Sequence, residues 1–207
     1  SAEKISDYLE TGRKWAAEIR KNDKAAKYYL FMWNCLWKSG ASLIHGHAQV
    51  TLSKEMHYAK IEYLRRCSLE YQMKYNSNYF LDLWQVHDFL GLSWKDGDVK
   101  GLVYLSPIKE KEIILINEKA NELSMYEQIY KAVCNYRAMG VESFNLVLYA
   151  PPLDEPDKNW EHFPYMIRLV DRGSLNNRTS DFGAMELYAS SVISSDPWKV
   201  IDKIKGE

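Results

Sequence analysis

The spacing of apolar residues along the chain predicts alternating helices and strands. Between Ile5 and Ile19, apolar residues recur three and four positions apart, which is typical of a helix with one buried face. The aromatic segment "KYYLFMWN" predicts a buried strand that ends at Asn34. A turn at 38–40 leads to "SLIHGHAQVTLS", which predicts a second strand, and residues 54–75 predict a long charged helix.

The second half of the chain begins near Leu83 and repeats this order. We expect successive strands in "WQVHDFLGLSW", "GLVYLSP" and "EIILI", with an Asp-Gly hairpin turn in "KDGD". A helix from Met125 to a stop at Gly140 follows. The segments "SFNLVLYA" and "HFPYMIRLVDR" predict two more strands, and a short final helix is expected to start near Asp196-Pro197. The recurrence of a helix followed by two strands predicts a weak internal repeat.

Composition and charge argue against several classes of function. The chain is 46% hydrophobic, which suffices for a substantial core, and its net charge of -1 gives no reason to expect a nucleic-acid partner. Its apolar runs are far shorter than the roughly 20 residues that cross a bilayer, and its start does not read as a signal peptide. We therefore expect a cytoplasmic protein without a membrane partner. The three cysteines lack a C-x-x-C spacing, which predicts reduced core thiols.

Two histidines, His45 and His47, stand one residue apart and would share one side of a strand with Leu43 and Gln49. They could be ordinary partly buried side chains. A metal site would need three or four convergent ligands, and the neighbouring sequence offers few. Neutral imidazole is also a good nucleophile towards phosphorus, and this third interpretation fits the surroundings better. Groups that could hold a phosphate lie nearby, namely Asn34, Gly40, Ser42, Gly46 and Gln49.

The run from Asn34 through "SGASLIHGHAQV" resembles the active-site segment of the galactose-1-phosphate uridylyltransferase family, a branch of the histidine-triad superfamily. In that family an asparagine stands eight residues before a serine, a glycine lies two before the same serine, and an H-x-H-x-Q motif follows. The sequence matches this register at six positions, which are Asn34, Gly40, Ser42, His45, His47 and Gln49. Gly46 replaces the frequent proline of the family, and no functional group is lost by this change.

The resemblance implies a role for each matched residue. His47 would attack the alpha-phosphorus of the donor and carry a covalent nucleotidyl group, and Gln49 would bind the transferred phosphoryl group. Asn34 and Ser42, with Gly40, would bind the distal phosphate or the sugar phosphate. His45 takes the place of a structural metal ligand, so zinc is possible, and no organic cofactor is expected.

The resemblance also implies an α+β fold of two histidine-triad-like lobes, each an antiparallel sheet with packed helices. Residues 1–82 would form the first lobe, which carries the motif and lacks the N-terminal strands of the family. Residues 83–207 would form the second lobe, in which "HFPYM" replaces a second H-x-H pair and leaves only His162. The tail "DFGAMEL" is similar to a strip that contacts the hexose, often in the neighbouring subunit, which implies a homodimer and a binding role for Glu186.

The function expected from this resemblance is a nucleotidyltransferase that acts on nucleotide sugar and sugar phosphate substrates. It would move a nucleoside monophosphate between a nucleoside diphosphate sugar and a sugar 1-phosphate, or phosphate, through nucleotidyl-His47. One alternative is a dinucleoside polyphosphate phosphorylase or adenylyltransferase. Another is a non-catalytic nucleotide-binding protein of the same fold.

Overall fold

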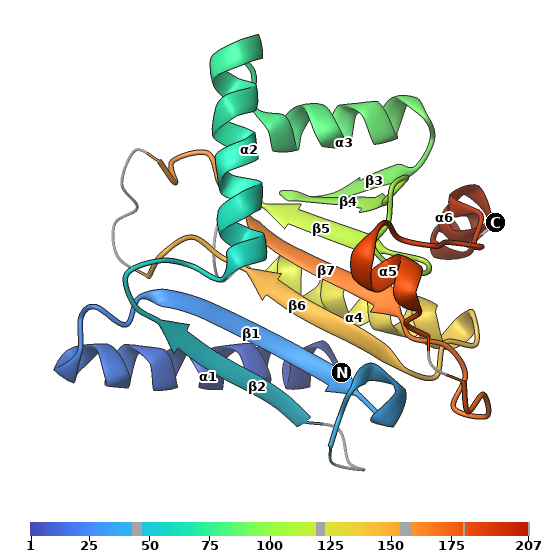
Figure 1. The fold of residues 1–207 in the computed structure, drawn as a ribbon, viewed down its shortest axis with the longest axis horizontal. Helices are drawn as coiled ribbons and strands as arrows, with labels where there is room; N and C mark the ends of the chain where they lie inside the picture. The colour runs from blue at the N-terminus through green and yellow to red at the C-terminus, as the bar shows by residue number, and fades with distance from the viewer. Residues whose placement is uncertain (43–46, 119–122, 154–158, 180, 207) are drawn as a thin grey trace.

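The computed structural model describes the chain except for residues 43–46, 119–122, 154–158, 180 and 207 (Figure 1). The described strands form one seven-stranded antiparallel sheet in the order β2-β1-β6-β7-β5-β4-β3. The strands are β1 (Tyr28–Cys35), β2 (His47–Ser53), β3 (Ser93–Asp96), β4 (Val99–Val103), β5 (Ile113–Asn117), β6 (Phe144–Tyr149) and β7 (Tyr165–Asp171). The helices are α1 (Ala2–Asn22), the 3-10 turn η1 (Trp37–Ser39), α2 (Ala59–Tyr75), α3 (Tyr79–Phe89), α4 (Leu123–Ala138), α5 (Ala184–Tyr188) and α6 (Pro197–Lys205).

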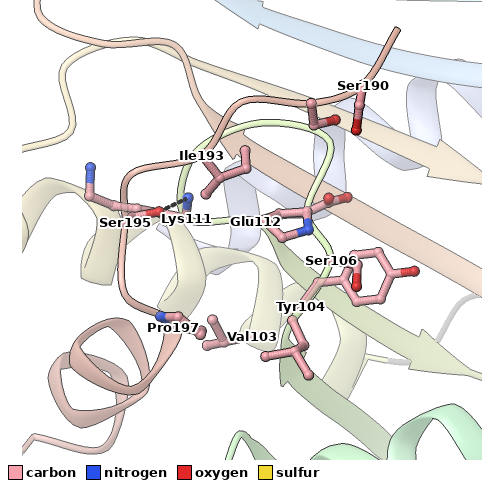
Figure 2. Close-up of a pocket in the computed structure, with 12 residues that line it drawn as sticks. Val103, Tyr104, Ser106, Lys111, Glu112, Ser190, Ile193, Ser195 and Pro197 are labelled. Carbon is pink, nitrogen blue, oxygen red and sulfur yellow. Dashed lines mark hydrogen bonds between the residues drawn. The ribbon is translucent and has the colours of Figure 1, made fainter. Parts of the chain in front are cut away.

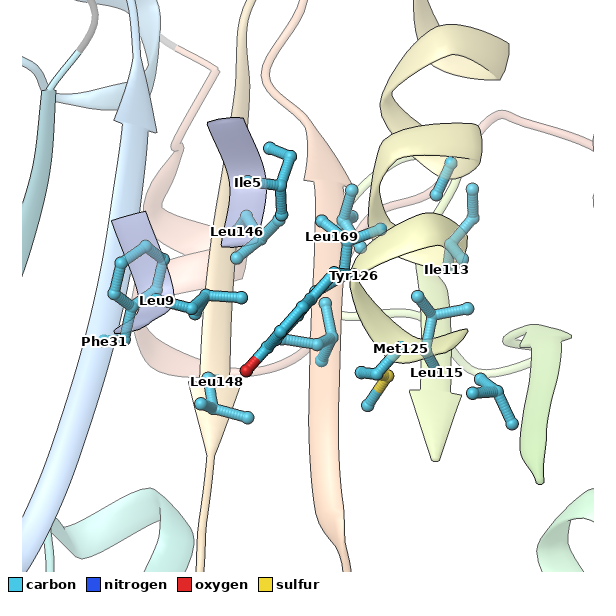
Figure 3. Packing of buried hydrophobic residues seen from close by; sticks show 14 of the residues in the cluster. Ile5, Leu9, Phe31, Ile113, Leu115, Met125, Tyr126, Leu146, Leu148 and Leu169 are labelled. Atoms are coloured by element: carbon cyan, nitrogen blue, oxygen red, sulfur yellow. The ribbon is translucent and has the colours of Figure 1, made fainter. Parts of the chain in front are cut away.

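The main hydrophobic core lies between one face of the sheet and the helices α1 and α4, which lie behind the sheet in Figure 1. Alternate strand residues supply this core, as the two-residue period of a strand requires. Figure 3 shows how Leu9 of α1 and Tyr126 of α4 pack beside Leu146 and Leu148 of β6. Removing this apolar surface from water is the largest contribution to the stability of the fold.

The opposite face of the sheet is divided into an apolar part and a polar part. Ile61 of α2 and Phe80 of α3 pack with Ile114, Ile116 and Met166 of β5 and β7 in a second cluster of buried residues. Elsewhere on this face, α5 lies in front of the sheet in Figure 1. Because α5 and its flanking tail cover the sheet only partly, polar side chains of β1, β2, β6 and β7 remain accessible between the covering elements.

Most of the elements expected from the sequence are confirmed. The first helix, the Asp-Gly hairpin between β3 and β4, and the helix that stops at Gly140 form as predicted. Gly140 has φ +77, a left-handed conformation that ends a helix at little cost for glycine. Asp196 caps the final helix, since its side chain accepts a hydrogen bond from the Trp198 backbone N–H at 3.0 Å.

The strand predicted in "WQVHDFLGLSW" is wrong over most of its length. Residues 79–89 form helix α3, and the strand β3 starts only at Ser93. The Asn78 side chain caps this helix by accepting hydrogen bonds from the backbone N–H groups of Phe80 and Leu81, at 2.8 and 3.3 Å. Phe80, Leu83 and Trp84, which are three and four residues apart, all pack in the second cluster of buried residues. Their spacing is that of a helix with one buried face.

Smaller differences concern α2, α5 and the cysteines. The helix α2 starts at Ala59 instead of residue 54, because His57 is buried just before it and bonds to the Ala150 carbonyl. The short helix α5 was not predicted from the sequence. Cys134 is exposed, so the prediction of a core thiol is wrong at that position.

The expected division into two lobes stays a prediction. Strands of both predicted lobes share one sheet, in which β1 pairs with β2 on one side and with β6 on the other. The boundary between residues 82 and 83 falls inside α3. Among the described residues, no helix combines the length and apolar character needed to cross a membrane.

Candidate functional site

The predicted nucleophile, His47, is the first residue of β2 and lies directly opposite Asn34 of β1. Side chains alternate between the two faces of a strand. Ala48 and Val50 face the main core, so His47 and Gln49 lie together on the opposite face of the sheet. Asn34 shares their face, and its Nδ2 donates to Oε1 of Gln49 at 3.4 Å. The structure thus brings together three of the residues that the sequence predicted.

The polar network continues from Asn34 into the neighbouring strand. Asn145 of β6 pairs with Asn34, and its Nδ2 donates both to Oδ1 of Asn34 at 2.7 Å and to the Ser39 carbonyl at 2.9 Å. Arg172, just beyond β7, donates through Nη1 to Oδ1 of Asn145. These bonds fix the orientation of the Asn34 amide and connect Gln49 of β2 to a guanidinium beside β7, three strands away.

The loop before the motif is anchored to the same network. Gly40 has φ +87, a conformation that favours glycine, and its backbone N–H donates to the Trp37 carbonyl at 3.0 Å. The Asn145 bond to Ser39 fixes the turn from which this loop leaves. Ser42 lies in the loop and is exposed. His45 and Leu43 lie outside the described residues.

A pocket of about 320 Å³ adjoins this network, and we call it the basic pocket. It lies on the same face of the sheet and is lined by side chains that include Lys60, Lys109, Asn145, Arg168, Arg172, Phe182 and Glu186. Its size falls in the range of small-molecule sites. Because Asn145 belongs both to the polar network and to the pocket wall, the two form one continuous polar surface.

Glu186, the predicted hexose contact, lies in this pocket instead of touching the described residues of the motif. Its Oε1 is 3.4 Å from Nζ of Lys109, and its Oε2 accepts from the Gly183 backbone N–H at 3.0 Å. Hydrogen bonds from the backbone N–H groups of Glu186 and Gly183, and the ammonium of Lys109, lower the pKa of this carboxyl. Glu186 therefore carries its negative charge at neutral pH.

Salt bridges and cation–π contacts hold the tail segment with Glu186 over the pocket. Arg172 donates to both oxygens of Asp181, from Nε at 2.7 Å and from Nη2 at 3.1 Å. Partial burial raises the pKa of Asp181, but the bonds from Arg172 outweigh it, so the pKa lies below its ordinary value. The cationic groups of Lys109 and Arg172 make cation–π contacts with the Phe182 ring, at 5.0 and 5.5 Å from its centroid.

Figure 2 shows a second cavity, of about 420 Å³. It shares one turn of the chain with the basic pocket, since Pro107 and Lys111 line the second cavity and Lys109 between them lines the basic pocket. We call it the serine-rich cavity, because Ser106, Ser190, Ser191 and Ser195 contribute to its lining. The tail closes it through a bond from the Lys111 backbone N–H to Oγ of Ser195 at 3.1 Å. Glu112 lines this cavity, and its salt-bridge partner Arg168 lines the basic pocket, so the pair stands between the two spaces.

Sequence reasoning missed the residues that complete the site from distant segments. Asn145 is the one amide side chain inside the apolar run "SFNLVLYA", and Arg168 is the one cation inside "MIRLVD". A charged or amide side chain in a buried strand needs a partner, and that is the signal that could have found both. Lys109 lies in the connection between β4 and β5, and Arg172 lies just beyond the end of β7, so neither gives such a signal.

No cluster of three or more His, Cys, Asp or Glu side chains that could hold a metal ion occurs in the described part of the chain. His45 is not among those residues. The zinc ion that the resemblance makes possible is therefore untested.

Comparison with known proteins shows a likeness in structure without a close likeness in sequence. No family model matches the sequence, and no curated protein matches it. A solved uridylyltransferase matches all of this chain and 68% of its own length, with a TM-score of 0.79 and 16% identity. A GalT-like protein from Arabidopsis thaliana matches 97% of this chain and 67% of its own, with a TM-score of 0.78 and 13% identity.

A third structure, an ADP-glucose phosphorylase from Arabidopsis thaliana with bound ADP-glucose, matches 98% of this chain and 66% of its own. Its TM-score is 0.76 and its identity is 12%. The chain thus spans about two thirds of the length of these proteins. At such low identity the likeness concerns the fold alone, and the chain shares its fold with these three proteins.

Proposed function

We propose that the protein is a nucleotidyltransferase that uses His47 as its nucleophile. The observation that carries this proposal is the position of His47 and Gln49 on one face of β2, opposite Asn34, where the amide network leads into the basic pocket. The likeness to a uridylyltransferase and to an ADP-glucose phosphorylase supports the same class of reaction.

The chemistry proceeds in two displacements. A ring nitrogen of His47 attacks the alpha-phosphorus of a nucleoside diphosphate sugar, a P–N bond forms, and the P–O bond to the sugar phosphate breaks. An oxygen of a second phosphate then attacks the same phosphorus, and the P–N bond breaks. Amide groups of Gln49 and Asn34 donate hydrogen bonds to the phosphoryl oxygens, on which negative charge develops in both steps.

The acceptor can be a sugar 1-phosphate, which gives a transferase, or inorganic phosphate, which gives a phosphorylase. The likeness to the ADP-glucose phosphorylase favours testing the second acceptor beside the first. A homodimer and a possible zinc ion at His45 belong to the proposal through the family resemblance, and no step above depends on either.

The direct test is the isolation of the covalent intermediate. The protein is incubated with UDP-glucose or ADP-glucose labelled at the alpha-phosphorus, and the label is tested for the acid lability and base stability of a phosphoramidate. We expect wild-type protein to become labelled at His47 and His47→Ala to remain unlabelled. His162→Ala is the control, since His162 is an exposed histidine that lies beside Asn159 and Phe163 in a different, small pocket, and the variant should be labelled like wild type.

The choice of donor identifies the nucleobase. Labelling by UDP-glucose alone indicates a uridylyltransferase, and labelling by ADP-glucose alone indicates an adenylyl-transferring enzyme. Absence of label from every nucleoside diphosphate sugar, with nucleotide binding retained in calorimetry, would contradict the proposal and indicate a binding protein.

A further inference from the structure

The lining of the basic pocket includes four cationic side chains but only one carboxylate. The cations are Lys60, Lys109, Arg168 and Arg172, and the carboxylate is Glu186. Three of the four already have an acidic partner, namely Glu186 for Lys109, Glu112 for Arg168 and Asp181 for Arg172. Lys60 is exposed at the start of α2 and has no ion pair among the described residues. The pocket therefore has an excess of positive charge that a bound anion would neutralise.

The guanidinium of Arg168 is held in place from behind the pocket. Its Nε and Nη2 lie 2.6 and 2.5 Å from Oε1 of Glu112. Glu112 is fully buried, and its Oε2 accepts from the Ile108 backbone N–H at 2.8 Å, so both carboxylate oxygens are satisfied. A cation fixed in this way loses little conformational freedom when it binds a ligand.

Glu186 occupies the position of a counter-ion in this pocket. Its carboxylate is the anion nearest to Lys109, and it comes from the tail, which is joined to the sheet mainly through side-chain contacts. An incoming phosphate would compete with this carboxylate for Lys109. Glu186 thus lowers the affinity of the pocket for an anion, whereas the four cations raise it.

We infer that the basic pocket binds a phosphate dianion, either inorganic phosphate or the phosphate of a sugar phosphate, with Arg168 and Lys60 as its main contacts and Glu186 as its competitor. The pocket wall at Asn145 lies two strands from His47, which corresponds to about 10 Å between the backbones. The bound anion therefore lies on the same face as the proposed nucleophile. Its role as a substrate of transfer rests on the proposed function, whereas its binding does not.

Calorimetric titration of the unlabelled protein with inorganic phosphate and with glucose 1-phosphate at low ionic strength tests the inference. Low salt is needed because screening weakens exposed charges such as Lys60. We expect Lys60→Ala to weaken binding about threefold to tenfold, and Arg168→Lys to weaken it about tenfold, because lysine keeps the charge but loses the planar fork. Glu186→Gln should bind phosphate several-fold more tightly.

Lys21→Ala is the matched control. Lys21 is an exposed lysine of α1, on the opposite side of the sheet, and its loss changes the net charge as Lys60→Ala does. Thermal unfolding of each variant checks that the fold is retained. Tighter binding to glucose 1-phosphate than to inorganic phosphate would identify the sugar phosphate as the ligand, and the reverse order would identify free phosphate.

Two results would overturn the inference. One is the absence of binding of either anion to wild-type protein at millimolar concentration. The other is equal binding by Lys60→Ala, Arg168→Lys and Lys21→Ala. The outcome is independent of the labelling test, since phosphate binding without nucleotidyl-His47 would refute the proposed function alone, and labelling without such binding would refute this inference alone.

Discussion

Acidification from pH 7 to pH 5 should destabilise the protein through one buried histidine, His57. Its side chain is 1% exposed, its Nδ1 accepts from the Tyr58 backbone N–H at 2.8 Å, and its Nε2 lies 3.2 Å from the Ala150 carbonyl. Nε2 therefore carries the proton, and the neutral ring satisfies both partners. Burial lowers the pKa of His57 from 6.5 to about 4, although the Ala150 carbonyl opposes this.

The sign of the effect follows from where the proton binds. Between pH 6.5 and about 4 the unfolded chain binds a proton at His57 and the folded chain does not, so the free energy of unfolding falls as the pH falls through this range. At 1.36 kcal/mol for each pKa unit, the loss between pH 7 and pH 5 is about 2 kcal/mol. The salt-bridged Glu62 contributes little in this interval, because Arg65 and Arg66 hold its pKa near 2 despite partial burial.

Urea unfolding at pH 7 and pH 5 measures this loss for wild type and for His57→Gln. Glutamine can still donate to the Ala150 carbonyl but does not titrate. We expect the unfolding midpoint of wild type to fall by about 1 M urea more than that of the variant, at an m-value of about 2 kcal/mol/M. The variant will be less stable at pH 7, and this does not affect the comparison. An equal pH dependence in both proteins would refute the assignment to His57.

Substitutions at three further positions test the packing and the cap of the last helix. Gly12→Ala should lower the melting temperature by several degrees. The new Cβ would lie 2.5 Å from Oη of Tyr29 and 2.9 Å from Cγ2 of Val50. Such overpacking costs about 1–3 kcal/mol, which exceeds the gain in helix propensity. Leu169→Ala, at a fully buried position, should lower the free energy of unfolding in urea by about 2–5 kcal/mol, and a loss below 1 kcal/mol would contradict the packing described. Asp196→Ala removes the cap of the last helix and should cost about 1 kcal/mol in the same assay, whereas Asp196→Asn should cost much less.

The sequence by itself determined the features that depend on neighbouring residues. The apolar stripe of α1, the Asp-Gly turn and the Asp196 cap were predicted because each results from interactions within a few residues. The alternation of β2 likewise predicted that His47 and Gln49 share a face. The same local reasoning failed at α3, where a short apolar segment is compatible with either period, and the Asn78 cap and the packing of Phe80 decide for the helix.

Only the tertiary structure decided which residues stand beside the predicted motif. Asn145 reaches Asn34 because β6 inserts between β1 and β7 in the sheet, and Arg172 reaches Asn145 because β7 is the next strand. Neither contact is local in the sequence, so no spacing rule predicts it. The position of Glu186 depends in turn on salt bridges between the tail and the sheet. The motif could therefore be recognised from the sequence, whereas the pocket beside it is formed by the order of the strands.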